Sequence, residues 1–247
     1  MRQIIQKMGR VRTVIIITVI SFLLAIMLDS LLAILLSHQF KQTEAIIRIL
    51  IISIILVPAI SWYLVGSFFD LEELEKDIKK LATYDELTGL LNRRVFYSSC
   101  EKLHSISVRN KQDYCILIVD MDGFKKINDT YGHASGDKVL SVFGQLSRET
   151  VRDSDVLARI GGEEFAFFLP NTNIEQAESL SHRLCEKVRK KAVISGNKYI
   201  QHTVSIGISI NMCDNKQTLE QTLKMADEAL CIAKNEGGNM IKTYSSE

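Results

Sequence analysis

Two long apolar segments constrain the fold of this chain most. Residues 14–36 form a run of 23 residues with one charge, Asp29, and residues 49–69 form a run of 21 residues with none. A helix of that length extends about 34 Å, and the hydrocarbon core of a bilayer is about 30 Å thick. The pattern predicts a transmembrane hairpin of two helices over residues 13–69, with Pro58 kinking the second helix mildly.

The basic residues indicate how this hairpin is oriented. Positive charges concentrate before the first segment and after the second: Arg2, Lys7, Arg10, Arg12, Lys76, Lys79 and Lys80. Because such charges stay on the cytoplasmic side, residues 1–12 and the C-terminal part are both expected there, in a multi-pass protein of the bacterial inner membrane. A cleaved signal peptide is the less favoured alternative, because the first run is too long and lacks a small-residue cleavage site.

Asp29 is the single charge inside the predicted spans. Intramembrane carboxylates often serve as ligand or proton sites. A polar contact across a helix pair is the simpler interpretation, and we prefer it because the sequence shows no partner for this carboxylate.

A short amphipathic connector follows over residues 70–83. Leu71, Leu74, Ile78 and Leu81 are spaced by three, four and three residues, so a helix would place them on one face. A face of this kind favours a parallel pair of helices from two copies of the chain. The alternative is a helix that packs against its own domain.

Residues 84–247 have the composition of a globular α/β domain. The formal net charge of the whole chain is +1, which gives no support for nucleic-acid binding. The five cysteines are scattered, which argues against a disulfide framework or a zinc site. Apolar and amphipathic patterns predict strands at 114–120, 156–160, 165–169, 203–210 and 240–244, and helices at 136–151, 174–191 and 219–234. This order predicts a mixed sheet with helices packed against it.

The chemistry of the domain is expected at an acidic hairpin. Gly161 and Gly162 separate two of the short strands and are followed by Glu163 and Glu164. Two glycines permit unusual backbone angles and leave a docking ligand unobstructed, whereas adjacent carboxylates repel each other unless a cation intervenes. A solvated hairpin turn is the plain alternative. Asp120 ends a neighbouring strand, and carboxylates grouped in this way are typical of magnesium sites for nucleoside triphosphates.

Three motifs in this order give a specific resemblance. Residues 85–94 read DELTGLLNRR, residues 120–137 read DMDGFKKINDTYGHASGD, and residues 161–165 read GGEEF. Over residues 82–244 the chain resembles the GGDEF family of diguanylate cyclases. The resemblance implies an α/β (α+β) fold like that of nucleotidyl cyclases and polymerase palm domains.

The resemblance also implies the reaction and its residues. Two GTP molecules are joined into cyclic di-GMP with release of two pyrophosphates, and each copy of the domain holds one GTP, so a homodimer is needed. Mg2+, with Mn2+ as an alternative, would be held by Asp120, the Met121 carbonyl, Glu163 and Glu164, and the two glutamates would share activation of the ribose hydroxyl. The implied substrate-binding residues are Phe124, Lys125, Asn128, His133, Asp137 and Lys234.

An R-x-x-D motif, Arg152 to Asp155, has the position of the family's inhibitory product site, with Arg159 as a helper. A surface salt bridge is the alternative. Gly238 stands where the family usually has an arginine, and Cys231 where it usually has a tyrosine. The loss of that arginine leaves open a second function, an inactive module that binds GTP or cyclic di-GMP as a receptor. A cyclic AMP cyclase or a polymerase has no support beyond the shared fold.

Overall fold

The computed structural model describes residues 11–24, 26–27, 57–213 and 217–245. The chain divides into two compact units, Met1–Lys79 and Lys80–Glu247. Each unit is described by itself.

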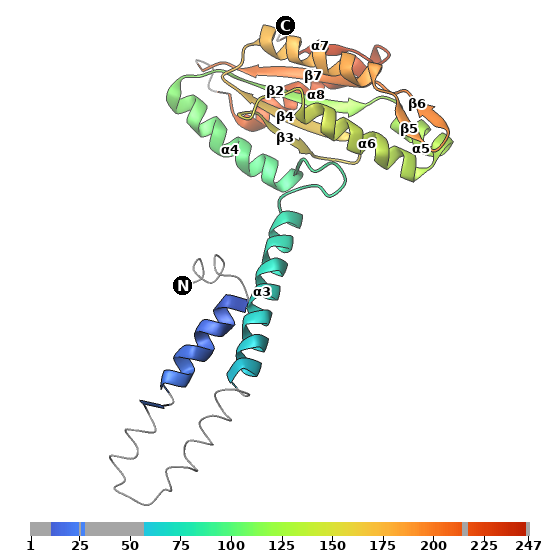
Figure 1. Cartoon of the computed structure of the whole chain (residues 1–247). Coiled ribbons are helices and arrows are strands. Elements are labelled where there is room, and N and C mark those ends of the chain that lie inside the picture. Colours follow the sequence, from blue (N-terminus) through green and yellow to red (C-terminus); the bar gives the residue numbers. More distant parts are fainter. Residues whose placement is uncertain (1–10, 25, 28–56, 214–216, 246–247) are drawn as a thin grey trace, which may run out of the picture. The chain divides into compact units, whose positions relative to one another are not determined.

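The N-terminal unit is helical wherever it is described. Residues 11–24 and 26–27 are helical, and α3 (Val57–Leu81) joins the end of the second apolar segment to the connector in one continuous helix (Figure 1). Among the described residues, no helix combines the length and the apolar character needed to cross a membrane. Asp29 and residues 28–36 and 49–56 of the predicted spans lie outside the described residues, so the transmembrane hairpin stays a prediction.

The connector is helical, as its pattern predicts. Its four apolar side chains, Leu71, Leu74, Ile78 and Leu81, are all more than half exposed in the single chain.

The C-terminal unit is built on a mixed six-stranded sheet (Figure 1). The strand order is β1 (Leu91–Asn92), β3 (Val156–Arg159), β4 (Glu164–Pro170), β2 (Tyr114–Met121), β7 (Val204–Asn211) and β8 (Ile241–Thr243). The four central strands are antiparallel, while β1 and β8 each pair in parallel with their neighbour. A separate hairpin is formed by β5 (Val193–Ser195) and β6 (Lys198–Ile200).

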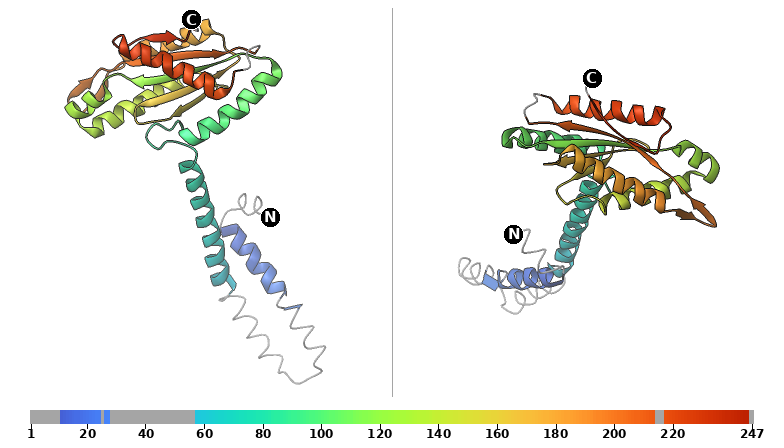
Figure 2. Two further views of the ribbon diagram at one scale, coloured as in Figure 1. Left: turned by 180° about the vertical axis from the view of Figure 1, so that it is seen from behind. Right: turned by 90° about the horizontal axis from the view of Figure 1, so that it is seen from above.

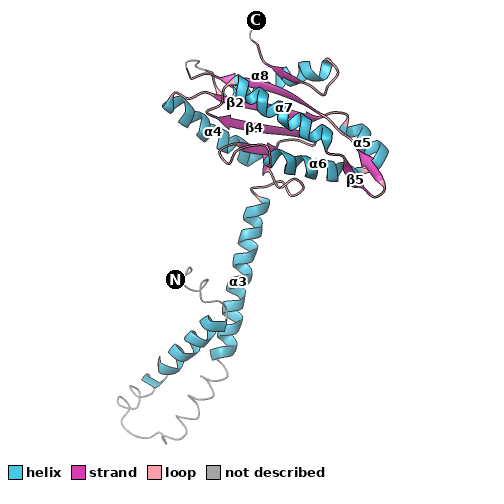
Figure 3. Ribbon diagram, turned by 45° about the horizontal axis from the view of Figure 1, so that its top comes forward, coloured by secondary structure: helices cyan, strands magenta, loops and turns pink. Residues whose placement is uncertain are grey.

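Helices cover both faces of the sheet, as the side-chain alternation of β2 requires. Its odd-numbered residues from Cys115 to Met121 share a core with α6 (His133–Arg148) and α7 (Ile174–Lys190). Its even-numbered residues from Tyr114 to Ile118 share the other core with α4 (Arg93–Asn110) and α8 (Leu219–Asn235). Figures 2 and 3 show α7 and α8 on opposite faces of the sheet. By the same alternation, Asp120 belongs to the α8 face.

The predicted mixed α/β fold is confirmed, with three local differences. Residues 124–131, for which no helix was predicted, form the helix α5 (Phe124–Tyr131). The helix α6 begins at His133 and ends at Arg148, about three residues earlier at each end than predicted. The helix α4 and the hairpin of β5 and β6 had no predicted counterpart.

Candidate functional site

The acidic turn joins β3 to β4 and is tied to the end of β2. The Ile160 and Gly161 amides donate to the Glu164 carbonyl, at 2.9 and 3.3 Å, and close the turn. The Met121 amide donates to the Glu163 carbonyl at 3.3 Å, and the strand register pairs Asp120 with Glu164. The sheet therefore gathers the predicted acidic residues at one edge.

The two glycines of the turn act differently from the prediction. Neither Gly161 nor Gly162 is among the glycines with positive φ, so unusual backbone angles are not why they are needed. A Cβ on Gly161 would overlap the Glu164 carboxylate, which folds back over it, whereas a Cβ on Gly162 would meet nothing within 4 Å. Gly161 thus makes room for Glu164, and Gly162 leaves the outer surface of the turn open.

Lys234 reaches the acidic edge from the last turn of α8. Its Nζ lies 2.7 Å from Asp120 Oδ2, and the Asp120 side chain is 5% exposed. Burial raises the pKa of Asp120 above its usual value, and the lysine offsets this only in part because Glu164 and Asp122 are also close. Burial likewise raises the pKa of Glu163, and the charges of Asp120 and Glu164 add to the effect. The edge thus holds more negative charge than one lysine neutralises.

The donor set suits a hard divalent cation. Carboxylate and carbonyl oxygens are the ligands that Mg2+ prefers, and unneutralised carboxylates gain from its charge. The described residues contain no preformed group of three or more His, Cys, Asp or Glu side chains that could hold a metal ion. Any metal site at this edge would therefore complete its ligand set with the Met121 carbonyl, water or substrate oxygens.

The guanine-reading residues that the resemblance implies meet between α5 and α6. Asn128 is half-buried, and its Oδ1 is buried without a hydrogen-bond partner among the described residues. That oxygen lies so close to Gly136 that a Cβ there would overlap it, and the Phe124 ring lies on the same side. Asp137 follows directly and is exposed. An unpaired buried acceptor beside an exposed carboxylate can receive the N–H groups of a base edge.

Lys125 and His133 are exposed near the starts of α5 and α6. The first amides of α5 have no partner within the helix, which is the usual state of a helix N-terminus. Both residues therefore lie at helix starts where the resemblance implies phosphate and base contacts.

Arg159 lies away from its predicted position. Its guanidinium donates to the Gly162 carbonyl, at 2.7 Å from Nη2 and 3.1 Å from Nε, and to Asp85, at 3.1 Å from Nη1 to Oδ2. It does not line the cavity that contains Arg152. Arg159 stabilises the acidic turn, because it links the Gly162 carbonyl to Asp85 of the D-x-L-T segment.

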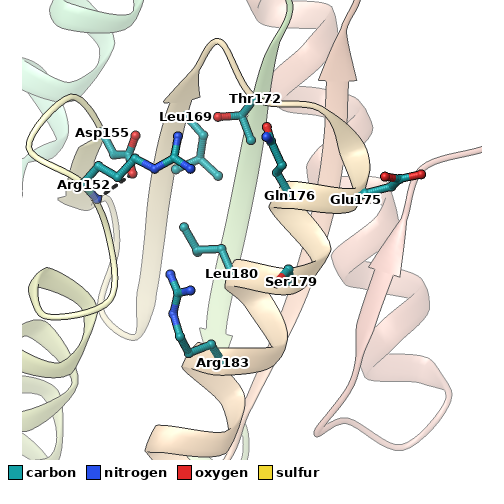
Figure 4. A pocket seen from close by; sticks show the side chains of 9 residues that line it. All are labelled: Arg152, Asp155, Leu169, Thr172, Glu175, Gln176, Ser179, Leu180 and Arg183. Carbon is teal, nitrogen blue, oxygen red and sulfur yellow. Dashed lines mark hydrogen bonds between the residues drawn. The ribbon is translucent and has the colours of Figure 1, made fainter.

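The R-x-x-D motif borders a cavity of about 260 Å3 between the segment that precedes β3 and the helix α7. The Arg152 backbone amide, rather than its guanidinium, donates to Asp155 Oδ2 at 2.9 Å. Figure 4 shows the Arg152 and Arg183 side chains both extending toward the space beside Leu169 and Leu180. The guanidinium of Arg183 also donates to the Thr150 carbonyl at 2.7 Å.

Sequence reasoning missed Arg183 as a member of this site. Leu180 and Leu184 of the predicted helix mark its buried face, and Arg183 lies on the edge of that face toward Arg152. The helical pattern alone does not place Arg183 near residue 152, because their proximity depends on how α7 packs on the sheet.

Known proteins share these features. The family profile described as "Diguanylate cyclase, GGDEF domain" matches residues 82–240. Diguanylate cyclase DgcM of Escherichia coli K12 is 36% identical over 170 residues, which cover 69% of this chain and 40% of DgcM. An uncharacterized membrane protein of Staphylococcus aureus USA300 is 34% identical over 209 residues, covering 84% of this chain and 58% of that protein. The chain thus spans less than two thirds of either relative.

A solved structure agrees with the fold. The GGDEF domain of DgcB from Caulobacter crescentus, in complex with c-di-GMP, matches with a TM-score of 0.64 at 27% identity, covering 67% of this chain and 97% of that domain. With its acidic turn, its antiparallel centre and a family match over residues 82–240, the chain belongs to the GGDEF diguanylate cyclase domain family.

Proposed function

We propose that this protein is a membrane-anchored diguanylate cyclase that condenses two GTP molecules into cyclic di-GMP and releases two pyrophosphates. The observation that carries the proposal is the edge formed by Asp120, Glu163 and Glu164 with Lys234 beside it. Phosphoryl transfer needs charge neutralisation and positioning more than covalent chemistry, and this edge offers both.

The chain's own residues divide the work of substrate binding. Asn128 offers an unpaired buried acceptor to the guanine edge, with Asp137 next to it. Lys125, the first amides of α5 and Lys234 are the groups assigned to the triphosphate in this proposal. To contact the triphosphate, Lys234 must exchange its contact with Asp120 Oδ2 for one with a phosphate oxygen.

We assign the metal to the same edge. Mg2+, or Mn2+ in its place, would be held by Asp120, the Met121 carbonyl and the two glutamates, and when bound it supplies charge neutralisation at the transferred phosphate. Glu163 and Glu164 then share the acceptance of the ribose hydroxyl proton.

The reaction needs two copies of the domain, because each copy offers one such edge. The exposed apolar face of the connector, Leu71, Leu74, Ile78 and Leu81, supports a parallel pair of α3 helices. The apolar segments 14–36 and 49–69 would anchor this dimer in the cytoplasmic membrane, with both ends of the chain on the cytoplasmic side. The similarity to a staphylococcal membrane protein over 84% of this chain is consistent with such an anchor.

Product inhibition is proposed for the cavity of Arg152, Asp155 and Arg183. Two guanidinium groups that extend into one cavity suit the phosphates of a cyclic dinucleotide. Arg152→Ala is expected to relieve inhibition by cyclic di-GMP without lowering the initial rate. Unchanged inhibition in both Arg152→Ala and Arg183→Ala would place the inhibitory site elsewhere.

The catalytic proposal is tested by incubating full-length protein in membranes with GTP and Mg2+ and identifying the product by mass. The native protein should form cyclic di-GMP, and Glu163→Gln should form none while retaining its fold. A Cys at position 74 should cross-link two copies. A cross-linked native protein that binds GTP yet forms no cyclic di-GMP would favour the receptor function, which Gly238 in place of the usual arginine supports.

A further inference from the structure

Asp122 lies two residues beyond Asp120 and accepts three hydrogen bonds. Its Oδ2 accepts from Thr203 Oγ1 at 2.6 Å and from the Asn239 backbone amide at 2.8 Å. Its Oδ1 accepts from Ser205 Oγ at 2.6 Å. A carboxylate has about four lone-pair directions, so three of them are already used. The donors come from the start of β7 and from the segment between α8 and β8.

The two aspartates therefore contact the connection between α8 and β8 at two points. Asp120 contacts the Lys234 side chain at the end of α8, and Asp122 contacts the amide of Asn239, five residues later. Between these points the chain leaves the helix by hydrogen bonds from the Gly237 amide to the Lys234 carbonyl and from the Gly238 amide to the Ala233 carbonyl. The position of Lys234 is thus coupled to the contact at Asp122.

Gly238 fits this arrangement because of its conformation. Its φ is +75°, which disfavours any residue with a side chain, and a Cβ there would lie 2.9 Å from Asp122 Oδ1. An arginine at this position would need a different path for residues 237–239. Gly238, which replaces the usual family arginine, and the contact with Asp122 are therefore parts of one local structure.

We propose that Asp122 is a positioning residue: it fixes the turn of residues 237–239, and through it Lys234, against the catalytic edge. Asp122 is not a magnesium ligand. The inference rests on the proposed function for its effect on turnover, but the hydrogen bond itself can be tested without substrate. Asn239 is exposed, so its amide is protected from solvent exchange mainly by Asp122.

The experiment compares Asp122→Ala, Asp122→Asn and Thr203→Val with the native full-length protein. Asp113→Ala is the matched control, because Asp113 flanks the other end of β2 and also accepts a distant backbone amide, that of Cys213, at 2.8 Å. Three quantities are measured: hydrogen exchange at residues 237–240 without nucleotide, KM and kcat for GTP, and the Mg2+ concentration that gives half the maximal rate.

Asp122→Ala should speed exchange of the Asn239 amide by at least about tenfold, the effect of losing one charge-assisted hydrogen bond. It should also raise KM for GTP while leaving the Mg2+ dependence unchanged. Asp122→Asn keeps one acceptor oxygen and should retain most of the protection of the Asn239 amide. Thr203→Val should fall between, and Asp113→Ala should change none of the three quantities.

Two results would overturn the inference. Unchanged exchange at Asn239 in Asp122→Ala would show that the contact does not hold the turn. A shift of Mg2+ dependence in Asp122→Asn as large as that in Asp120→Asn would make Asp122 a metal ligand. If the native protein forms no cyclic di-GMP, the proposed function fails, and the exchange data together with GTP affinity still decide the role of Asp122.

Discussion

Arg159 forms an ion pair with Asp85, 74 residues earlier in the chain, with 3.1 Å between Nη1 and Oδ2. The same guanidinium holds the Gly162 carbonyl of the acidic turn. Burial alone would raise the pKa of Asp85, but hydrogen bonds from Thr88 and the charge of Arg159 outweigh it and hold the pKa below its usual value. The carboxylate therefore stays charged at neutral pH and contributes stability that is lost only as the pH falls below about 4.

Arg159→Lys should lower turnover about tenfold or more, because a lysine cannot bridge Asp85 and Gly162 with a planar fork. The loss of charge-assisted hydrogen bonds should reduce the free energy of unfolding by about 1–2 kcal/mol. Arg148→Lys is the control: Arg148 donates to the Thr88 and Gly89 carbonyls of the same segment but not to the turn. It should lower stability without lowering turnover, as measured by thermal unfolding and initial rates.

Glu163→Gln should stabilise the metal-free protein while abolishing catalysis. Because the pKa of Glu163 is raised in the folded protein, the folded state binds the proton more tightly than the unfolded state. In EDTA, the stability of the native protein relative to Glu163→Gln should thus rise as the pH falls from neutral toward 4.5. The exposed Glu101→Gln on α4 is the control. A melting temperature in EDTA at pH 7 that is lower in Glu163→Gln than in native protein would contradict this account.

Gly136→Ala should weaken GTP binding, because its Cβ would overlap Asn128 Oδ1 and displace the side chain that we propose reads guanine. A loss of about tenfold in affinity is expected, since a buried polar contact is removed. Gly144→Ala on the same helix is the matched control. Its Cβ would press on Thr88 at 2.9 Å, far from Asn128 in the sequence, so it should cost stability and leave affinity unchanged. Calorimetric titration with GTP separates the two effects.

His202→Val should increase stability. His202 is 4% exposed, and in the described part of the chain neither ring nitrogen has a hydrogen-bond partner of ordinary geometry. Burial lowers the pKa of His202, and the nearby Ile200 backbone offsets this only in part. The unfolded state therefore binds the proton more readily, and the native protein should lose stability relative to the valine variant as the pH falls below about 6.5. The valine variant should gain about 1–3 kcal/mol and lose that acid sensitivity. Equal stability of the two proteins at pH 5.5 would refute this assignment.

The sequence predicted the elements whose patterns are local. The run at residues 114–120 and the hairpin around Gly161 appear as β2 and the β3–β4 pair. Asp120 and Glu163 could be assigned to one site from the sequence, because the strand ends of one sheet meet at one edge. The helix α5 escaped prediction because Gly123 and Gly132, which bound it, make its sequence typical of a turn.

The remaining site features depend on long-range packing. Arg159 was named as a helper of the product site from the family resemblance, but its side chain pairs with Asp85, which no local pattern indicates. Arg183 and the donors of Asp122 come from elements more than 25 residues away from their partners. Such contacts follow from how helices and strands pack, which period and propensity do not determine.

The proposed reaction joins one GTP bound by each of two copies across facing acidic turns. The most direct test expresses native and Glu163→Gln chains together in varied ratios, at constant total protein in membranes, and measures the initial rate of cyclic di-GMP formation. If both copies must supply a working edge, the rate per total protein falls as the square of the native fraction, to about one quarter at equal amounts. A rate that falls in direct proportion to the native fraction, or no cyclic di-GMP from the native protein alone, would contradict the proposal.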